Sequence, residues 1–557
     1  MENIFEYEDN GGELTIIRLK QGVKATSIII PEKIDGKPVS YIGNFAFSGS
    51  NIKKVTISEN IKRVGKEAFS GCNQLFSAIW KAKCEIPEEC FSYCSKLSRF
   101  SFANAEAIGK KAFAKSGLRS ITLPKNIKKV ETCAFGGCEN LEKVVWRAQA
   151  NIIPSSCFSR CSKLSIFDCE NLESIGAHAF KGCNLIVVHL PQNTKRVEIG
   201  AFQNCERLEN IIWSEKTYKI PENCFENCIK LSAFDFSNIK VIKSNAFRKT
   251  GLKKIKLPQN VEKVESYAFQ CCLKLEEVIW NTQFGTIPQN CFHACHALVK
   301  FDFSNIEIIE KDAFAFSGLK EIILPQNIKS ISPFAFYSCE ELRSVVWNAN
   351  YNIIPPTCFG NCINLESFDF SNIEIIESCA FVGAALKKIK LSQSVKTINI
   401  DAFADCTELQ LVVWEAQCNS IPAECFFNCQ KLSAFNFLNI KEIGRRAFYN
   451  SGIKVICLES ETAVETECFA CCHSLEKAQW LPDSAIKSAV FEDCSNLKEV
   501  IISDKVKNIA VDAFKGCPNM ELTFVYVGLS IILDTIIKKF DRRKPFEGTH
   551  RTVVCST

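Results

Sequence analysis

The sequence predicts an α/β repeat solenoid, a fold in which short units of similar sequence stack along one axis. Two observations support this prediction. A phenylalanine preceded by Ala, Cys or Val recurs 22 times from Phe47 to Phe514 at intervals of 21 to 23 residues. The seven tryptophans recur at intervals of 66 or 67 residues, so three repeats form one larger unit. We therefore expect about 22 repeats of 22–23 residues, arranged in a 67-residue triplet super-repeat.

Each repeat opens with a segment of the form Leu-x-x-Ile-x-Leu, as in LRSITL from Leu118. The alternation of apolar and polar residues predicts a short strand with one buried face, and stacked strands predict a long parallel sheet. Proline follows many of these segments, as at Pro124 and Pro191, and is expected to end the ladder where the chain turns. The following Ala-Phe-x-x-Cys segment should form the opposite wall as a short turn or a single helical turn.

The full unit, LRSITLPKNIKKVETCAFGGC from Leu118, resembles the repeat of the BspA-like leucine-rich repeat family. The stretch SIIIPEKIDGKPVSYIGNFAFSGS from Ser27 is similar to the usual first repeat of such proteins. The resemblance covers residues 25 to about 520. It implies a leucine-rich repeat fold and a non-catalytic surface or scaffold protein, often an adhesin.

Four regions are expected along the chain. Residues 1–24 should form an N-terminal cap, in which DNGGE is the turn of a hairpin. Residues 25–521 should form the solenoid. Residues 522–540 should supply a C-terminal cap strand and an amphipathic helix over the open end of the core, with a membrane anchor as the alternative for this segment. Residues 541–557 are expected to be a mobile tail.

The charge and the N-terminal residues bear on partners and compartment. The net charge is +5 and the basic residues do not form a long run, so we expect no nucleic-acid partner. The first 20 residues have neither a basic region nor a continuous apolar segment of the kind that a secretory signal needs. This favours a cytoplasmic protein, with the cell surface as the alternative. We expect a monomer.

The 32 cysteines follow the repeat. In the repeats that carry tryptophan, Cys replaces the Ala that precedes Phe, as at Cys157 and Cys224, and a second Cys follows four residues later. A small residue replacing a small residue favours core packing, so we predict a ladder of free thiols. Disulfides between stacked cysteines and zinc binding are the alternatives, because stacked repeats are separated by ~4.8 Å, within the range that a disulfide bridges.

The densest group of metal-ligand residue types is CFHACH, which contains Cys291, His293, Cys295 and His296. The two histidines occupy positions that carry unrelated polar residues in other repeats, so we expect a solvated turn and no metal or cofactor. The sequence also contains no GxSxG, HExxH, Walker or dinucleotide-binding motif. We therefore expect no enzymatic activity.

The solvent-facing middle position of the strands is the candidate binding face. It carries Val or Ile in tryptophan repeats, Asp in Phe-Asp-Phe repeats and Lys in several others. Its candidate residues are Val145, Asp168, Ile212, Asp235, Lys256, Ile279, Asp302, Val346, Asp369, Lys390 and Val413. Stacking should place Asp235 beside Lys256 and Asp369 beside Lys390 as exposed ion pairs.

Repeated apolar positions flanked by charge suit an extended partner, because solenoids present continuous surfaces. The sequence thus favours an interaction scaffold that binds a protein along this face. The alternative is a cell-surface adhesin or surface antigen that binds a host protein or glycan. Maintenance of the sheet alone would also explain the pattern.

Overall fold

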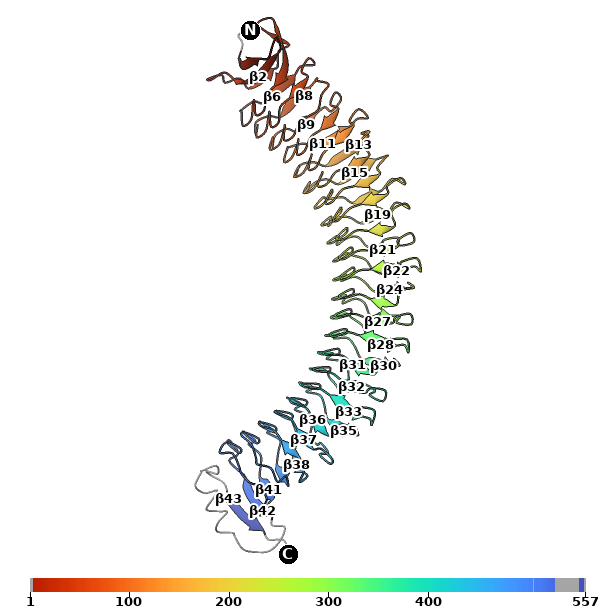
Figure 1. The fold of residues 1–557 in the computed structure, drawn as a ribbon, viewed down its shortest axis with the longest axis vertical. Coiled ribbons are helices and arrows are strands. Elements are labelled where there is room, and N and C mark those ends of the chain that lie inside the picture. Colours follow the sequence, from red (N-terminus) through yellow and green to blue (C-terminus); the bar gives the residue numbers. More distant parts are fainter. Residues whose placement is uncertain (1–3, 504, 526–549, 555–557) are drawn as a thin grey trace. The chain divides into compact units, whose positions relative to one another are not determined.

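The computed structural model describes residues 4–503, 505–525 and 550–554. The chain divides into two compact units. Unit 1 contains residues 1–275 and 279–283, and unit 2 contains residues 276–278 and 284–557. Together the described residues form about 21 turns of parallel strands. In each unit, one turn of the solenoid consists of three parts (Figure 1). These are a strand of the Leu-x-x-Ile-x-Leu segment, which we call the long-strand position, a short strand, and a compact turn segment that contains the repeated phenylalanine.

Unit 1 begins with a hairpin, as the DNGGE turn predicts. Strand β1 (Phe5–Asp9) pairs antiparallel with β2 (Leu14–Leu19). Strand β2 in turn pairs parallel with β5 (Lys37–Ile42), which also pairs antiparallel with β4 (Lys33–Ile34). The hairpin therefore joins the first turns of the solenoid by its second strand.

The remaining strands of unit 1 alternate between the two strand positions. The long-strand position holds β3 (Ser27–Ile29), β6 (Lys54–Ile57), β8 (Ser77–Trp80), β9 (Arg99–Phe100), β11 (Ser120–Leu123), β13 (Lys143–Trp146), β15 (Ile166–Cys169), β17 (Val187–His189), β19 (Asn210–Ile212) and β22 (Lys254–Leu257). The short strands are β7 (Arg63–Val64), β10 (Ala107–Ile108), β12 (Lys129–Val130), β14 (Ile152–Ile153), β16 (Ser174–Ile175), β18 (Arg196–Val197), β20 (Lys219–Ile220), β21 (Val241–Ile242) and β23 (Lys263–Val264).

Unit 2 repeats the arrangement, and β24 (Glu277–Trp280) lies at the division between the units. Its long-strand position holds β26 (Lys300–Phe301), β28 (Glu321–Leu324), β30 (Ser344–Trp347), β33 (Lys388–Leu391), β35 (Leu411–Trp414), β38 (Val455–Leu458), β40 (Lys477–Trp480), β41 (Glu499–Ser503), β42 (Glu521–Val525) and β43 (His550–Val554). The short strands are β25 (Thr286–Ile287), β27 (Ile308–Ile309), β29 (Ser330–Ile331), β31 (Ile353–Ile354), β32 (Ile375–Ile376), β34 (Thr397–Ile398), β36 (Ser420–Ile421), β37 (Glu442–Ile443) and β39 (Ala463–Val464).

The turn segments correct the expected α/β character, because the described residues contain no helix. Successive turns are joined by backbone hydrogen bonds: Phe91 N donates to Ala112 O over 2.7 Å and Tyr93 N to Ala114 O over 2.8 Å. Tyr93 and Glu89, two residues after and before Phe91, have φ angles of +59° and +53°. A helix needs consecutive right-handed residues, so left-handed residues at these two positions replace a helical turn by a flat turn that bonds to its neighbours.

The expected long parallel sheet is a series of short sheets of two to five strands, as in the order β11-β13-β15. The ladder is interrupted at several Phe-Asp-Phe repeats. Residues 231–236, for example, are described by the structure and form no strand. The rings of Phe234 and Phe236 lie 5.1 and 5.3 Å from that of Phe247, so this segment packs through its rings. One backbone hydrogen bond, from Lys253 N to Ser232 O over 3.2 Å, joins it to the next turn.

The core of each unit is built on the repeated phenylalanine. Phe158 is fully buried, and its ring stacks on Phe135 at 5.6 Å and on Phe180 at 5.5 Å between centroids. Trp146 contacts the same ring edge-on at 6.0 Å. The indole N–H of Trp146 donates to Ala150 O over 2.8 Å, which satisfies the polar atom of a buried tryptophan within its own turn.

The described cysteines are free thiols, and most of them are buried. Burial of Cys157 and Cys224 agrees with the predicted packing role. The cysteine three residues after Phe has a polar partner as well: at fifteen described positions its S–H donates to the carbonyl of the phenylalanine one repeat earlier, as from Cys205 to Phe180 O over 3.2 Å. Where Ser or Thr takes the same position, its hydroxyl lies beside the cysteine of the following repeat, as Thr250 Oγ1 does at 3.2 Å from Cys272 Sγ.

At the C-terminal end of unit 2, β41, β42 and β43 continue the parallel ladder. The predicted amphipathic helix or anchor falls almost entirely on residues 526–540, which lie outside the described residues. Within the described residues, no helix has the length and apolar character needed to cross a membrane. The boundaries of the four predicted regions stay predictions.

We expect Phe158→Ala to destabilise the protein by about 3–5 kcal/mol, because the cavity cannot collapse between two stacked rings. Phe76→Ala is the matched control, since Phe76 is 42% exposed. Urea denaturation followed by circular dichroism measures both. Equal effects of the two substitutions would contradict a core held by the ring stack.

We expect the stability to fall as pH rises above about 8.5, the pKa of an unperturbed thiol. Burial raises the pKa of Cys205 and of Cys406 to about 12. The folded state then binds more protons than the unfolded state, so stability is complete below the unfolded pKa and is lost as pH rises toward 12.

Urea midpoints measured from pH 7.5 to 10 under reducing conditions test this expectation. The double variant Cys205→Ala, Cys406→Ala should show a shallower pH dependence than the parent. An identical slope in both proteins would mean that other groups cause the loss.

Candidate binding face

The structure places the candidate residues on one side of the long strands in each unit. Within β22 the alternation is complete: Ile255 and Leu257 are buried and Lys256 between them is exposed. Nine of the eleven candidates are exposed, while Val145 and Val413 are half-buried. The pleat of the strand thus determines whether each side chain points toward the core or toward solvent.

The predicted ion pairs do not form. Among the described residues, neither Asp235 with Lys256 nor Asp369 with Lys390 lies within 4 Å as an ion pair. The carboxylates of Asp235 and Asp369 instead accept hydrogen bonds from the backbone N–H two residues later, over 2.9 and 3.0 Å. An aspartate that caps its own turn in this way is held locally, so its side chain is not available to reach the next strand.

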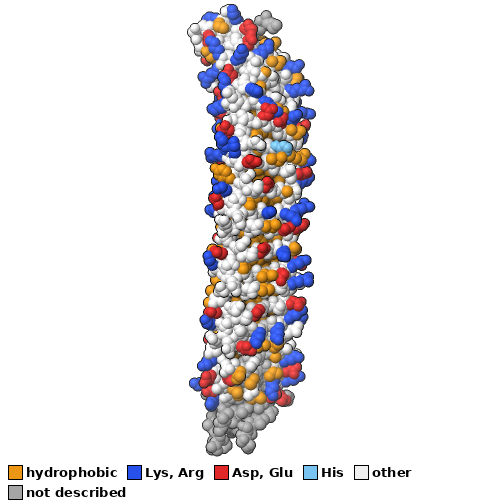
Figure 2. Space-filling view, turned by 90° about the vertical axis from the view of Figure 1, so that its right-hand side faces the viewer, with side chains coloured by type: hydrophobic (Ala, Val, Ile, Leu, Met, Phe, Trp, Pro, Cys, Tyr) orange, Lys and Arg blue, Asp and Glu red, His pale blue; other side chains and the backbone are white. Residues whose placement is uncertain are grey.

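Two apolar candidates have exposed neighbours across the ladder. In unit 2, Val346 of β30 stands opposite Ile323 of β28, and the two side chains are 41% and 52% exposed. In unit 1, Ile212 of β19 stands opposite His189 of β17. Figure 2 shows hydrophobic side chains gathered along this side, with charged side chains on both flanks.

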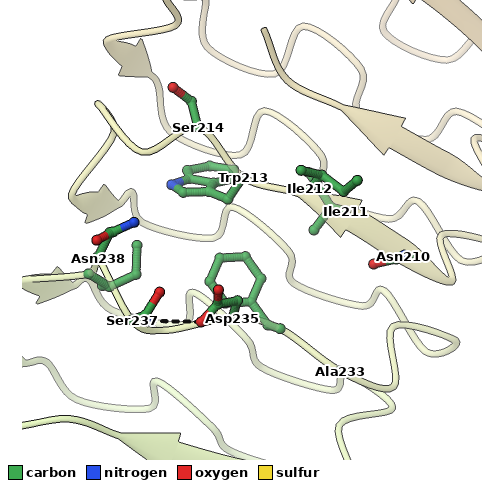
Figure 3. A pocket seen from close by; sticks show the side chains of 11 residues that line it. Asn210, Ile211, Ile212, Trp213, Ser214, Ala233, Asp235, Ser237 and Asn238 are labelled. Atoms are coloured by element: carbon green, nitrogen blue, oxygen red, sulfur yellow. Dashed lines mark hydrogen bonds between the residues drawn. The ribbon is translucent and has the colours of Figure 1, made fainter. Parts of the chain in front are cut away.

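Unit 1 also has a cavity of about 450 Å³ beside Ile212. It brings together two of the candidates, Ile212 and Asp235, with Trp213, Ser214 and Asn238. Figure 3 shows these side chains around the opening and the hydrogen bond that Asp235 accepts from Ser237. The face is therefore concave beside Ile212, where it presents an aromatic edge, a carboxylate and several neutral polar groups.

The sequence did not reveal Trp213 as part of this surface. Trp146 is 1% exposed, whereas Trp213 is half-buried, as is Trp414. The indole N–H of Trp213 donates to Thr217 O over 2.7 Å, as that of Trp146 does to Ala150 O. The tryptophan motif itself does not report this difference in exposure.

The cysteine and histidine cluster near Cys291 has no visible metal geometry. Across the part of the chain that the structure describes, no group of three or more His, Cys, Asp and Glu side chains is arranged to hold a metal ion. Cys291 and Cys295 are buried in the core, and the ring of His293 lies 5.2 Å from Phe316. Burial lowers the pKa of His293, which favours a neutral packed ring.

Solved structures with a similar fold include three bacterial proteins. A leucine rich cell surface protein from Faecalibacterium prausnitzii A2-165 is 18% identical, with 75% of this chain and 94% of that chain covered and a TM-score of 0.36. The T. pallidum leucine rich repeat protein TpLRR is 22% identical, with coverage of 37% and 88% and a TM-score of 0.30. The pneumococcal vaccine antigen PcpA is 16% identical, with coverage of 100% and 98% and a TM-score of 0.23. A search of curated protein sequences found no match.

The family model of the BspA type leucine rich repeat region matches the chain in six overlapping copies. These copies cover residues 20–142, 84–209, 173–299, 218–342, 285–410 and 397–521. Together with the stacked parallel strands, this match shows that the chain belongs to the BspA-type leucine-rich repeat family.

Proposed function

We propose that the protein is a non-catalytic scaffold that binds a protein partner along the long-strand face. The exposed pair Ile323 and Val346 carries the proposal, because two half-exposed apolar side chains stand side by side on a rigid ladder. Complete burial of a large apolar side chain contributes about 1.5–3 kcal/mol of favourable free energy, so a partner that covers this pair binds more tightly. A single apolar side chain on a surface would not support the same argument.

The surroundings of the pair favour a partner that is itself a protein. Asp302 and Asp369 lie at the equivalent position of the neighbouring Phe-Asp-Phe repeats, so the apolar centre has a charged rim. A fully buried apolar centre within a polar rim is the usual composition of a protein interface. The cavity beside Ile212 in unit 1 adds a place where a partner side chain can insert, with Asp235 favouring a basic one.

A second candidate is a cell-surface adhesin. Membership of the BspA-type family favours it, since the resemblance implies surface proteins of this kind. The two candidates share the same face and differ in compartment and partner, so they need separate experiments.

We expect Val346→Asp to weaken partner capture at least about tenfold, because the introduced carboxylate must be desolvated at the centre of the contact. The assay places a photoreactive side chain at position 323 of the full-length protein and measures crosslinked partner from source cells. Ile363→Asp is the matched control, since Ile363 is 54% exposed but lies outside the long strands.

The charged rim is tested by Asp302→Lys combined with Asp369→Lys, which should reduce capture further. Capture that is unaffected by Val346→Asp, or equally reduced by Ile363→Asp, would contradict binding through this face. Unchanged urea midpoints in all variants are required for the comparison.

The adhesin candidate predicts that a membrane-impermeant biotin reagent labels the protein on intact source cells. Lysed cells are the positive control for reactivity of its lysines. Labelling that requires lysis would remove the adhesin candidate and leave the scaffold.

A further inference from the structure

The turn segments of unit 1 form a second hollow, on a wall that the proposed protein-binding face does not use. It has a volume of about 420 Å³ and spans five successive turns, from the turn of Phe91 to the turn of Phe180. Both its shape and its charge follow from the residues that flank the buried phenylalanines.

Small residues form the floor of the hollow. The position directly after the buried phenylalanine carries Ser92, Ala114, Gly136 and Ser159 in four consecutive turns, and all four line the cavity. At ~4.8 Å per turn these positions extend over ~14 Å. Some other turns carry a large side chain at this position, such as Arg248, whereas the two turns before the hollow carry Ser48 and Ser70.

Left-handed residues form the two rims, because their side chains leave the turn on the outside. Lys111 and His178 lie on one rim with φ angles of +52° and +54°, and Lys115 and Arg160 lie on the other with +56° and +61°. Gly137, in the middle of the second rim, has a φ of +72° and no side chain. A Cβ atom there would come within 3.0 Å of the Lys115 side chain, so glycine keeps the hollow open at its centre.

The hollow carries an excess of positive charge. Its cations are Lys111, Lys115, Arg160 and Lys181, and its only carboxylate is Glu89, which pairs with Lys111 at 3.0 Å. Within the described residues, no carboxylate lies within 4 Å of the other three cations. Lys115 instead lies 4.7 Å from the centre of the Tyr93 ring.

Some cations elsewhere on this wall pair with a carboxylate of a neighbouring turn. Arg248, for example, lies 2.9 Å from Glu226 of the preceding turn. For Lys115, Arg160 and Lys181 the same position of the preceding turn carries Tyr93, Gly137 and Ser159, which supply no carboxylate. The hollow therefore combines three cations that have no carboxylate partner with a small, hydroxyl-bearing floor.

We propose that this hollow binds the sulfate esters of a linear sulfated polysaccharide. Arginine and lysine recognise tetrahedral oxyanions through charge-assisted hydrogen bonds, and cations at both ends of a ~14 Å floor can hold more than one such group. The serine hydroxyls of the floor and rim suit the hydroxyl groups of a sugar. The shallow floor of small residues accommodates a chain that has no large apolar side groups.

Two other polyanions fit less well. Single-stranded nucleic acid needs aromatic side chains on which bases stack, and the phenol ring in the hollow, that of Tyr93, has Lys115 over its face. An acidic peptide would use backbone hydrogen bonds, but the turn backbones already bond to one another, as from Gly137 N to Ser159 O over 2.8 Å.

The test measures binding of a heparin oligosaccharide to the full-length protein by calorimetry at 0.15 M salt. Arg160→Ser combined with Lys181→Ser should weaken binding roughly tenfold, since two charge contacts are lost. Lys253→Ser combined with Lys256→Ser changes the net charge equally on the other wall and should change the affinity less than about twofold. Ser159→Leu fills the floor, keeps every charge and should also weaken binding.

Three results would overturn the proposal. The first is an equal loss of heparin affinity in both double variants, or an unchanged heparin affinity in Ser159→Leu. Either result indicates diffuse attraction of heparin to the basic surface. The second is equal binding of chemically desulfated heparin. The third is tighter binding of an oligothymidine of matched charge, which would assign the hollow to nucleic acid. Loss of heparin binding in the two hollow variants alone, with weak binding of the other two probes, supports it.

Discussion

The backbone hydrogen bonds between successive turn segments are the constraint on which the rest of the structure depends. They hold adjacent turns at one spacing, and this spacing brings the phenylalanine rings into stacking contact and the thiols within reach of a carbonyl one repeat away. Left-handed residues on both sides of each phenylalanine make these bonds possible. Their cost of about 1–2 kcal/mol each for non-glycine residues is offset by a hydrogen bond and a ring contact in every turn.

This constraint separates the two surfaces of the solenoid. On the long-strand side, side chains alternate between the core and solvent. The middle position of each strand is therefore the one that a bound partner would contact. On the turn side, most of the left-handed positions are exposed or half-buried, and they carry charge, aromatic rings or glycine. One repeat can therefore vary two surfaces without disturbing the core that both share.

Sequence periodicity was sufficient to predict the stacked parallel strands, the buried phenylalanine and cysteine columns and the exposed middle position of the strands. It was insufficient where the outcome depends on backbone conformation or on the neighbouring turn. The turn segment around Phe91 has no glycine to mark its left-handed residues, so Glu89 and Tyr93 read as part of a short helical turn. The half-burial of Trp213 and the local capping by Asp235 depend on the three-dimensional surroundings of each side chain, which no single motif encodes.

The thiol column also affects how the chain must reach its folded state. Stacked repeats are separated by ~4.8 Å, so successive cysteines of the column lie in the range where an oxidant could join them. In the folded protein, burial covers most of these thiols and raises the pKa of many of them, as at Cys205 and Cys406, which lowers their reactivity. An unfolded chain with 32 cysteines has no such protection and very many wrong pairings available. If the repeats fold before an oxidant reaches the thiols, the cysteines are buried and cannot form wrong disulfides. The order of folding and oxidation therefore decides whether one structure or a mixture of crosslinked chains results.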